Sequence, residues 1–375
     1  MITSPTLYLF ALAIIAVSIS LVEKKTKWKF FKYIPSVVLI YACTMFFASV
    51  GVWELNKEIN DIYKITKTNL LPAMIFLMLL EVDLRKFFKL GKKLIISYTL
   101  AVLSIGIGFI AVSSILNFDK DMLGAFGALA GSWMGGTANM VAVGSALEVS
   151  DEAFGYALVV DSFNYTLWVA LLLFLVGFAN LFNKFTGSDP SDEIINAIGC
   201  SCNMGAKRYW FLVFISVIVS LISQVVAQNI SIINSTTTMV IFATIVGILG
   251  SFTKVGKMNG SSDIATSMLF MLIALIGSRA VFENFSGVGY YVYAGFLILL
   301  IHSVIMLIGA KVFKLDLFSI SVASLSNIGG VASAPILAAT YHKSLVGVGV
   351  LMAIMGYIIG TFGGLIVAHI IIGLA

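Results

Sequence analysis

Uncharged runs of membrane-spanning length constrain this chain more than any other feature. Residues 7–22 and 156–182 carry almost no charge, and each is long enough to cross a bilayer as a helix. Across the chain only 11% of residues are charged and the mean hydropathy is +1.05, whereas about 25% charged residues is usual in soluble domains. A transmembrane barrel would instead show alternating segments of about ten residues. We therefore predict an all-α polytopic protein of the cell membrane, in contact with the lipid bilayer.

Composition and motifs exclude several function classes. The net charge of +5 comes from Lys and Arg beside apolar segments, which is typical of membrane topology, so we expect no nucleic-acid partner. HExxH, Walker A and paired CxxC motifs do not occur in the sequence. No His or Lys falls within the polar motifs described below, so we expect no enzyme. We predict no cofactor apart from Na⁺ as a coupling ion.

The chain is predicted to contain an internal repeat. A shift of 194 residues superposes Gly135-Gly136 on Gly329-Gly330 and Arg85 on Arg279. A single offset that holds across four segments indicates two related halves. The apolar segments form two sets of six, which are 6–22, 34–53, 70–84, 94–116, 122–147 and 154–182, then 210–228, 237–252, 262–282, 288–313, 318–341 and 344–373.

The distribution of positive charge predicts how the two halves are oriented. If every segment crossed the membrane, Lys and Arg would divide 12 to 11 between its sides. If 122–147 and 318–341 enter and leave on one face, the second half is inverted, and 18 of the 23 Lys and Arg residues lie inside. We therefore predict two inverted repeats, each with about five transmembrane helices and one broken or re-entrant Gly-rich segment. Both termini are then outside. Segment 70–84 is an alternative re-entrant segment, because it contains Glu81 and Asp83.

The two inverted repeats are predicted to be the domains of the protein. The first covers residues 1–182 and the second covers 210–375. Residues 183–209 connect them as a cytoplasmic linker containing the polar sequence GSDPSDE.

Two glycine-rich stretches interrupt apolar segments at equivalent positions of the repeats. They read GSWMGGTANM (131–140) and LSNIGGVASAP (325–335). A helix break at bilayer depth costs several kcal/mol for each unpaired backbone group unless protein or water reaches it. Matched interruptions in inverted repeats are typical of transporter binding sites. The alternative explanation is close packing of helices through small residues. The predicted substrate-binding residues are Trp133, Gly135, Gly136, Thr137, Asn139, Ser326, Asn327, Gly329, Gly330 and Ser333.

Asp161 and Asn164 are the predicted ion-coupling residues. An intramembrane carboxylate is costly, which makes Asp161 a functional candidate. Asn164 follows three residues later, on the same face of a helix. Together they could hold Na⁺, a hard ion that takes oxygen ligands, or Asp161 could carry a proton. The alternative is that Asp161 is an N-cap at the membrane edge.

Three other residues have structural interpretations. Trp53 lies at the end of an apolar segment, which indicates an interfacial position. His302 is interpreted as a satisfied packing residue. Arg279 is interpreted mainly as an anchor that extends its charge to the membrane surface.

The runs AGSWMGGTANMVAVGSAL, ALVVDSFNYTLW and SNIGGVASAP resemble the YjcL-like bacterial membrane proteins of unknown function, along essentially the whole chain. More distantly, the chain is similar to the cation/proton antiporter and anion transporter superfamily, which includes NhaA-type antiporters and bile-acid, glutamate and citrate sodium symporters. The resemblance implies broken helices that cross at the substrate and ion site, and a homodimer with elevator-like motion. It implies core helices in 70–182 and 262–373 and scaffold helices in 6–53 and 210–252. The chain lacks the paired acidic motif of the antiporters, because Asp161 stands alone.

These observations predict a secondary active transporter. It would move a small anionic or zwitterionic organic solute, coupled to Na⁺ or H⁺. A monovalent cation/proton antiporter that uses Asp161 is one alternative, and a non-transporting receptor or channel is another. The sequence specifies neither the solute, nor the coupling ion, nor the direction of coupling.

Overall fold

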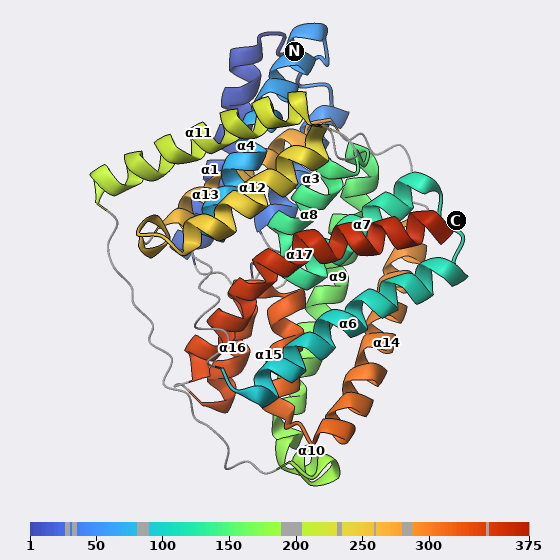
Figure 1. Ribbon diagram of the computed structural model, residues 1–375. Coiled ribbons are helices and arrows are strands. Elements are labelled where there is room, and N and C mark those ends of the chain that lie inside the picture. The colour runs from blue at the N-terminus through green and yellow to red at the C-terminus, as the bar shows by residue number, and fades with distance from the viewer. Residues whose placement is uncertain are drawn as a thin grey trace. The chain divides into compact units, whose positions relative to one another are not determined.

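The computed structural model describes residues 1–26, 31, 36–80, 90–188, 205–230, 235–258, 260–279, 287–342 and 345–374. Within these ranges the regular secondary structure is helical, apart from one isolated bridge between Ile2 and Trp53 (Figure 1). The all-α class predicted from hydropathy is therefore confirmed. The α-helices are α1 (Pro5–Thr26), α3 (Ser36–Ser49), α4 (Lys57–Leu79), α6 (Lys92–Ile115), α7 (Lys120–Gly135), α8 (Thr137–Ala146), α9 (Asp151–Leu175), α10 (Ala179–Thr186), α11 (Ala206–Asn229), α12 (Ser235–Ser251), α13 (Ser261–Gly277), α14 (Val288–Phe313), α15 (Leu317–Ile328), α16 (Gly330–Tyr341) and α17 (Val346–Leu374).

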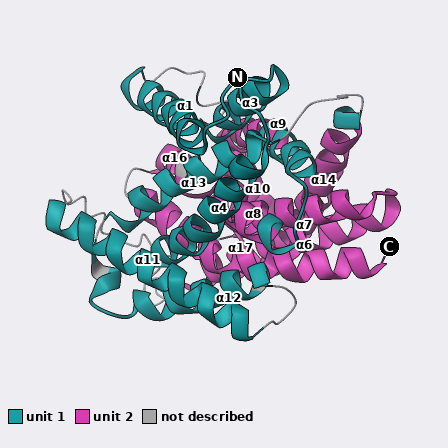
Figure 2. Ribbon diagram, turned by 90° about the horizontal axis from the view of Figure 1, so that it is seen from above, with its two compact units in different colours: residues 1–81, 144–162, 203–289 teal, residues 82–143, 163–202, 290–375 magenta. Residues whose placement is uncertain are grey.

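The chain divides into two compact units, shown in teal and magenta in Figure 2. Unit 1 comprises Met1–Glu81, Gly144–Ser162 and Asn203–Gly289. In it α4 packs against α11, α12 and α13, and α3 packs against α1 and α13. Glycines allow two of these contacts, because Gly247 lies against Leu79 and Gly277 lies against the backbone of Tyr41.

Unit 2 comprises Val82–Val143, Phe163–Cys202 and Tyr290–Ala375. Its longest packed helix is α17, which runs along α7 and also contacts α6, α15 and α16. Glycines at a spacing of four line the contact between α7 and α17, so that the backbones approach closely. His302 of α14 bridges this unit internally, since its ring nitrogens meet Ser104 Oγ at 2.7 Å and Ser324 Oγ at 2.8 Å. The packing interpretation of His302 therefore agrees with the structure.

The repeat seen in the sequence recurs in the order of the helices. With the same shift of 194 residues, α6 overlaps α14, α7 overlaps α15, α8 overlaps α16 and α9 overlaps α17. Each half thus contains a long helix, a broken pair of helices and a second long helix. Whether the halves are inverted stays a prediction from the charges, and so does the division into scaffold and core.

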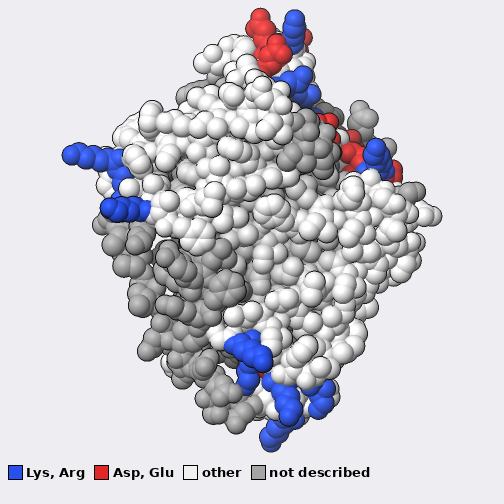
Figure 3. Space-filling model, in the orientation of Figure 1, with Lys and Arg blue, Asp and Glu red and all other residues white. Residues whose placement is uncertain are grey.

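Six helical stretches among the described residues are long and apolar enough to cross a membrane, which are Pro5–Thr26, Lys92–Ile115, Asp151–Thr186, Ala206–Asn229, Val288–Phe313 and Val346–Leu374. Several of them expose apolar side chains along one face, as α9 does with Phe163, Leu167 and Phe174. On the face drawn in Figure 3, charged side chains occupy small patches and most of the described surface is uncharged. These features fit a multi-pass protein whose outer helix faces contact lipid.

Helix α4 begins well before the predicted segment 70–84. The side chain of Asn56 caps it by accepting a hydrogen bond from the Ile59 N–H at 2.9 Å. Its first half is charged and polar, and a hydropathy pattern detects only the apolar half. Glu81 and Asp83, on which the alternative re-entrant segment depends, lie outside the described residues.

Candidate functional site

The first glycine-rich stretch breaks a buried helix. Helix α7 ends at Gly135 and α8 begins at Thr137, with Gly136 between them at φ +92° and ψ 170°. Only glycine adopts this conformation readily, because a Cβ atom would clash with the backbone. Apart from its own neighbours in the chain, a Cβ atom built at Gly136 would meet no atom within 4 Å. The Gly136 N–H donates a hydrogen bond to the Ser132 carbonyl at 2.5 Å. The break is therefore a property of the backbone conformation and not of crowding.

The second glycine-rich stretch breaks a helix at the equivalent position. Helix α15 ends at Ile328 and α16 begins at Gly330, which has φ +59°. A Cβ atom at Gly330 would again meet nothing within 4 Å. In both halves the second glycine of the pair has the positive φ. The broken helices predicted from the sequence are thus present in both halves.

The first glycine of each pair has a different role, which is close packing. A Cβ atom at Gly135 would collide with the Gly356 carbonyl of α17 and the Asn139 side chain. A Cβ atom at Gly329 would collide with Ser333 Oγ and with the ring of Tyr165. The alternative explanation by helix packing therefore accounts for one glycine of each pair and leaves the other to the break.

Each break is covered by the last long helix of the other half. At the first break, Thr361 of α17 donates to Asn139 Oδ1 at 2.6 Å. At the second, Tyr165 of α9 lies against Gly329, and Trp168 Nε1 donates to Ser324 Oγ at 2.9 Å. All of these residues belong to unit 2. The two halves thus complete each other's broken helices.

Asn139 and Ser333 are equivalent in the repeat but differ in their hydrogen bonding. Asn139 Nδ2 donates to the carbonyls of Gly135 at 2.7 Å and Gly356 at 3.3 Å, and its oxygen accepts from Thr361. Ser333 is 5% exposed, and its Oγ has no hydrogen-bond partner within the described chain. The first break is therefore satisfied by protein groups, and the second is not.

Two more unpartnered oxygens lie at the second break. Ser326 and Asn327 are fully buried, and neither Ser326 Oγ nor Asn327 Oδ1 has a hydrogen-bond partner in the part of the chain that the structure describes. The Asn327 Nδ2 donates to the Ala323 carbonyl at 2.8 Å, which leaves its oxygen as an acceptor. A buried polar group without a partner costs about 1–3 kcal/mol. Three such oxygens therefore lie on α15 and α16 near the second break.

Trp133 precedes the first break on α7, and Thr137 follows it on α8. Trp133 is fully buried on α7 and makes an edge contact with Phe109, at 5.3 Å between ring centroids. Thr137 is half-buried at the first position of α8. Asn327 occupies the position equivalent to Trp133, so an aromatic wall in one half is replaced by an amide in the other.

The structure changes the interpretation of Asp161. It lies in the interior of α9, which begins at Asp151, so the N-cap alternative is wrong. Asp161 is half-buried and belongs to the part of α9 grouped with unit 1. Asn164 is buried in unit 2, where its Nδ2 donates to the Val292 carbonyl at 3.2 Å. Their joint ion site stays a prediction.

Comparisons with known proteins place the chain in a family. The profile of the family described as "Protein of unknown function (DUF819)" matches residues 8–374. The chain belongs to this family. It is also 24% identical over 385 residues to the uncharacterized membrane protein YjcL of Bacillus subtilis (strain 168), an alignment that covers 93% of this chain and 92% of that protein. The resemblance to the YjcL-like membrane proteins is therefore confirmed, whereas the link to the transporter superfamily stays a prediction.

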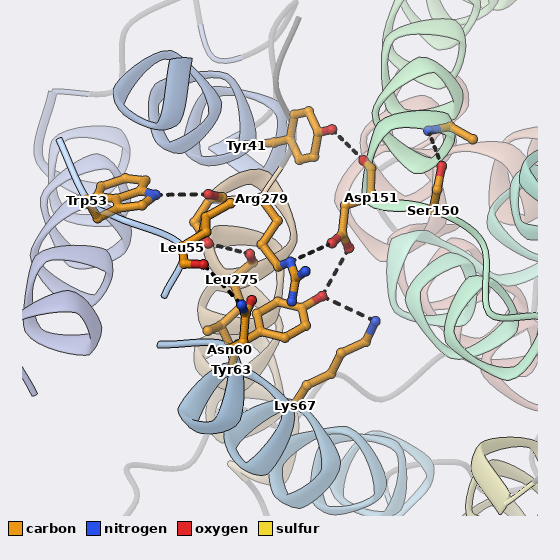
Figure 4. A network of polar contacts seen from close by, with 12 residues as sticks. Tyr41, Trp53, Leu55, Asn60, Tyr63, Lys67, Ser150, Asp151, Leu275 and Arg279 are labelled. Carbon is orange, nitrogen blue, oxygen red and sulfur yellow. Dashed lines mark hydrogen bonds and ion pairs between the residues drawn. The ribbon is translucent and has the colours of Figure 1, made fainter. Parts of the chain in front are cut away.

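Unit 1 contains a second polar cluster, centred on Asp151 and drawn in Figure 4. The Tyr63 hydroxyl donates to Asp151 Oδ1 at 3.0 Å, and Arg279 Nε lies 3.5 Å from Asp151 Oδ2. The Arg279 guanidinium also lies over the Tyr63 ring, 4.6 Å from its centroid. The Tyr41 hydroxyl donates to the Asp151 main-chain carbonyl at 2.8 Å. Arg279, interpreted from the sequence as a surface anchor, thus forms an ion pair.

Lys67 completes the Asp151 cluster from α4. Its ammonium lies 3.5 Å from the Tyr63 hydroxyl. Burial lowers the pKa of Lys67, and the nearby Asp151 carboxylate opposes part of this effect. Lys67 and Asp151 carry no sequence signal of such a cluster, because each lies at the edge of an apolar segment, where charges are common.

Trp53 lies at the border of this cluster. It is 3% exposed, and its Nε1 donates to the Ser278 carbonyl at 2.9 Å. Tyr8 packs edge-on against it at 5.8 Å between ring centroids. Its indole is therefore held by protein inside unit 1, and its interfacial position in the membrane stays a prediction.

Proposed function

We propose that this protein is a secondary active transporter and not an enzyme. It moves a small anionic or zwitterionic organic solute, coupled to Na⁺ or H⁺, by elevator-like alternating access in a homodimer. The observation that carries the proposal is the pair of helix breaks at Gly136 and Gly330, each with a positive φ and each covered by a helix of the other half. Such breaks place backbone dipoles and polar side chains inside a protein that faces lipid.

The unpartnered oxygens support the second break as the place where a ligand binds. Packing of small residues explains Gly135 and Gly329, but it leaves three side-chain oxygens without a hydrogen-bond partner in the described part of the chain, which are Ser326 Oγ, Asn327 Oδ1 and Ser333 Oγ. An amide oxygen accepts and a hydroxyl both accepts and donates, so this set suits either Na⁺ or a solute with polar hydrogens. The solute and the ion are proposed to bind at the two breaks, with Trp133, Thr137 and Asn139 on the side of the first.

Asp161 and Asn164 are proposed to act in ion coupling. Asp161 is a carboxylate in the interior of a candidate membrane-spanning helix, which is a costly place for a charge. If the protein is instead a cation/proton antiporter, Asp161 is the residue that exchanges the ions. Replacement by Asn distinguishes the two, because it removes antiport entirely but leaves solute binding at the breaks.

The test is uptake by purified protein in proteoliposomes. Radiolabelled amino acids and dicarboxylates are offered under an inward Na⁺ gradient and, separately, under an inward proton gradient. We expect uptake of a member of one class, and we expect Gly136→Leu and Asn327→Ala to abolish it. A Leu side chain cannot adopt φ +92° without strain, and Ala removes the amide oxygen.

Gly177→Leu is the matched control for Gly136→Leu. A Cβ atom at Gly177 also meets open space, but this glycine does not have a positive φ. Uptake that persists in Gly136→Leu and in Asn327→Ala would contradict the proposed site. Ion-selective currents without saturable uptake would favour a channel instead.

A further inference from the structure

A cavity of about 320 Å³ lies within unit 1. One face of α4, the turn between α8 and α9, and the start of α12 form its walls. Small-molecule sites begin at about this volume. The wall from α4 carries Lys64 and Lys67, which are one helical turn apart and therefore share a face. The turn after α8 contributes Glu148, and the start of α9 contributes Asp151.

The charge of Asp151 is already compensated by protein groups. Its carboxylate is paired with Arg279 and accepts the hydrogen bond of Tyr63, as Figure 4 shows. It therefore fixes the position of the cavity wall. The groups that remain for a ligand are the Lys64 ammonium, the Glu148 carboxylate and the hydrogen-bond donors of Lys67 that Tyr63 does not use, and the charge of Lys67 also acts on Asp151.

The Lys67 ammonium has hydrogen-bond donors that its contact with Tyr63 does not use. It is half-buried beside the cavity, and its contacts within the described chain are with Tyr63, at 3.5 Å from the hydroxyl and 5.7 Å from the ring centroid. An ammonium has three donors, and the hydroxyl uses one of them. The others can bind a carboxylate in the cavity.

Glu148 holds its carboxylate at a backbone position that favours glycine. Its φ is +55°, and it follows the end of α8. Its N–H bonds to the Ser145 carbonyl at 3.2 Å, and the Val149 N–H bonds to the Gly144 carbonyl at 3.0 Å. This is the pattern in which a helix ends at a left-handed residue, usually Gly or Asn. This helix ending places the exposed Glu148 at the cavity wall.

Apolar side chains complete the cavity. Leu71 of α4, Met239 of α12 and Val149 line it beside the charged groups. A ligand that fits this surface has a cationic group, an anionic group and a short aliphatic part.

We propose that this cavity binds a small zwitterion of the amino-acid class, with its carboxylate on Lys67, its ammonium on Glu148, and an aliphatic side group against Leu71 and Met239. This inference goes beyond the proposed function, because it assigns a second solute site in unit 1, apart from the two breaks. Lys64 adds a second positive charge on the carboxylate side of the cavity.

The test is equilibrium binding of radiolabelled leucine to the full-length protein in lipid nanodiscs. Competitors are 4-methylpentanoate, which lacks the ammonium, and isopentylamine, which lacks the carboxylate. We expect saturable binding that alanine, valine and unlabelled leucine displace, and that both single-charge analogues displace at least about tenfold less well. Absence of binding by all three amino acids, or equal displacement by either analogue, would overturn the inference.

Variants locate the binding. Lys67→Met removes the ammonium but keeps an aliphatic chain, and Glu148→Gly removes the carboxylate. Each is expected to weaken leucine binding about tenfold or more. Lys57→Met on α4 and Glu152→Gln at the start of α9 change exposed charges that do not line the cavity, and both variants should bind leucine normally.

Glu148→Gly also separates binding from folding. Glycine suits φ +55°, so this variant should have a higher melting temperature than the parent while it binds leucine less tightly. Normal leucine binding by both Lys67→Met and Glu148→Gly would refute the assignment of the cavity.

The two proposals fail in different ways. If break variants abolish uptake of another solute while no amino acid binds, the cavity inference fails and the proposed function stands. If leucine binds at the cavity but Gly136→Leu and Asn327→Ala do not alter its uptake, the proposed site of transport fails and the cavity stands.

Discussion

Two serines two residues apart on α15 have opposite hydrogen-bonding states. Ser324 Oγ is contacted by Trp168 and His302, and Ser326 Oγ has no partner among the described groups. Ser324→Ala should therefore lower the free energy of unfolding by about 1–3 kcal/mol, because two buried polar groups lose their partner. Ser326→Ala should leave stability unchanged or raise it while it reduces uptake. Melting temperatures in detergent and uptake in proteoliposomes measure the two effects.

The comparison of Ser324 and Ser326 contains its own control. Both changes remove one buried hydroxyl from the same helix, so a general effect of the substitution would be equal. If Ser326→Ala destabilises the protein as much as Ser324→Ala, its hydroxyl has a structural partner and the ligand interpretation of this serine is wrong.

Lys67 predicts how leucine binding depends on pH. Burial lowers its pKa, so the ammonium loses its proton at a lower pH than an ordinary lysine does. Leucine affinity should therefore fall as the pH rises through this lowered value. In Lys67→Arg the side chain stays charged, and the fall should move to higher pH. Binding titrations from neutral to alkaline pH measure the difference, and coincident profiles would contradict the role of Lys67.

The pH dependence of stability that Lys67 causes is opposite in sign to that of a lysine in an ordinary ion pair, whose pKa is raised by folding. Its pKa in the folded protein lies below the value in the unfolded chain, so the unfolded chain binds the proton more tightly. The contribution of this residue to stability therefore rises with pH between the two pKa values. Lys67→Met should remove this dependence from melting curves.

Helix packing at the first break gives a prediction for α7. Gly135→Ala should lower the free energy of unfolding by about 1–3 kcal/mol, because the new methyl group meets the Gly356 carbonyl of α17. Gly177→Ala places the same methyl group in open space and should be neutral. Thermal unfolding of both variants measures the contrast. An equal effect of the two changes would show that α7 and α17 do not pack this tightly.

The sequence predicted the broken helices, but it did not predict which glycine of each pair breaks the helix and which one allows close packing. A Gly-Gly pair inside an apolar segment indicates a break, and both breaks are present. Which glycine adopts the positive φ depends on what the other one touches. For Gly135 that is Gly356, and for Gly329 it is Tyr165, and each partner is distant in the sequence. The sequence also could not predict that the side-chain oxygens of Ser326, Asn327 and Ser333 lack partners among the described residues, because hydrogen bonding depends on tertiary structure.

The ion pair of Arg279 shows the same limit of local patterns. A single arginine after an apolar segment is typical of a membrane-surface anchor. Its partner Asp151 and the ring of Tyr63 come from other helices of unit 1, so no short stretch of sequence contains the pair. Hydropathy, by contrast, depends on composition within one segment, and it predicted the all-α membrane class correctly.

At the scale of the whole molecule, the inverted arrangement of the repeats can be tested at one pair of residues. Lys120 and Lys314 are equivalent under the shift of 194, and each is an exposed lysine just before or at the start of a broken helix. The charge distribution places Lys120 outside and Lys314 inside. In a background in which Cys43, Cys200 and Cys202 are replaced by Ser, Lys120→Cys should react with a membrane-impermeant maleimide in intact cells. Lys314→Cys should react only after the cells are permeabilised. Parallel repeats would place both cysteines on the same side, and labelling of both in intact cells would therefore exclude the inversion, together with the alternating-access mechanism that depends on it.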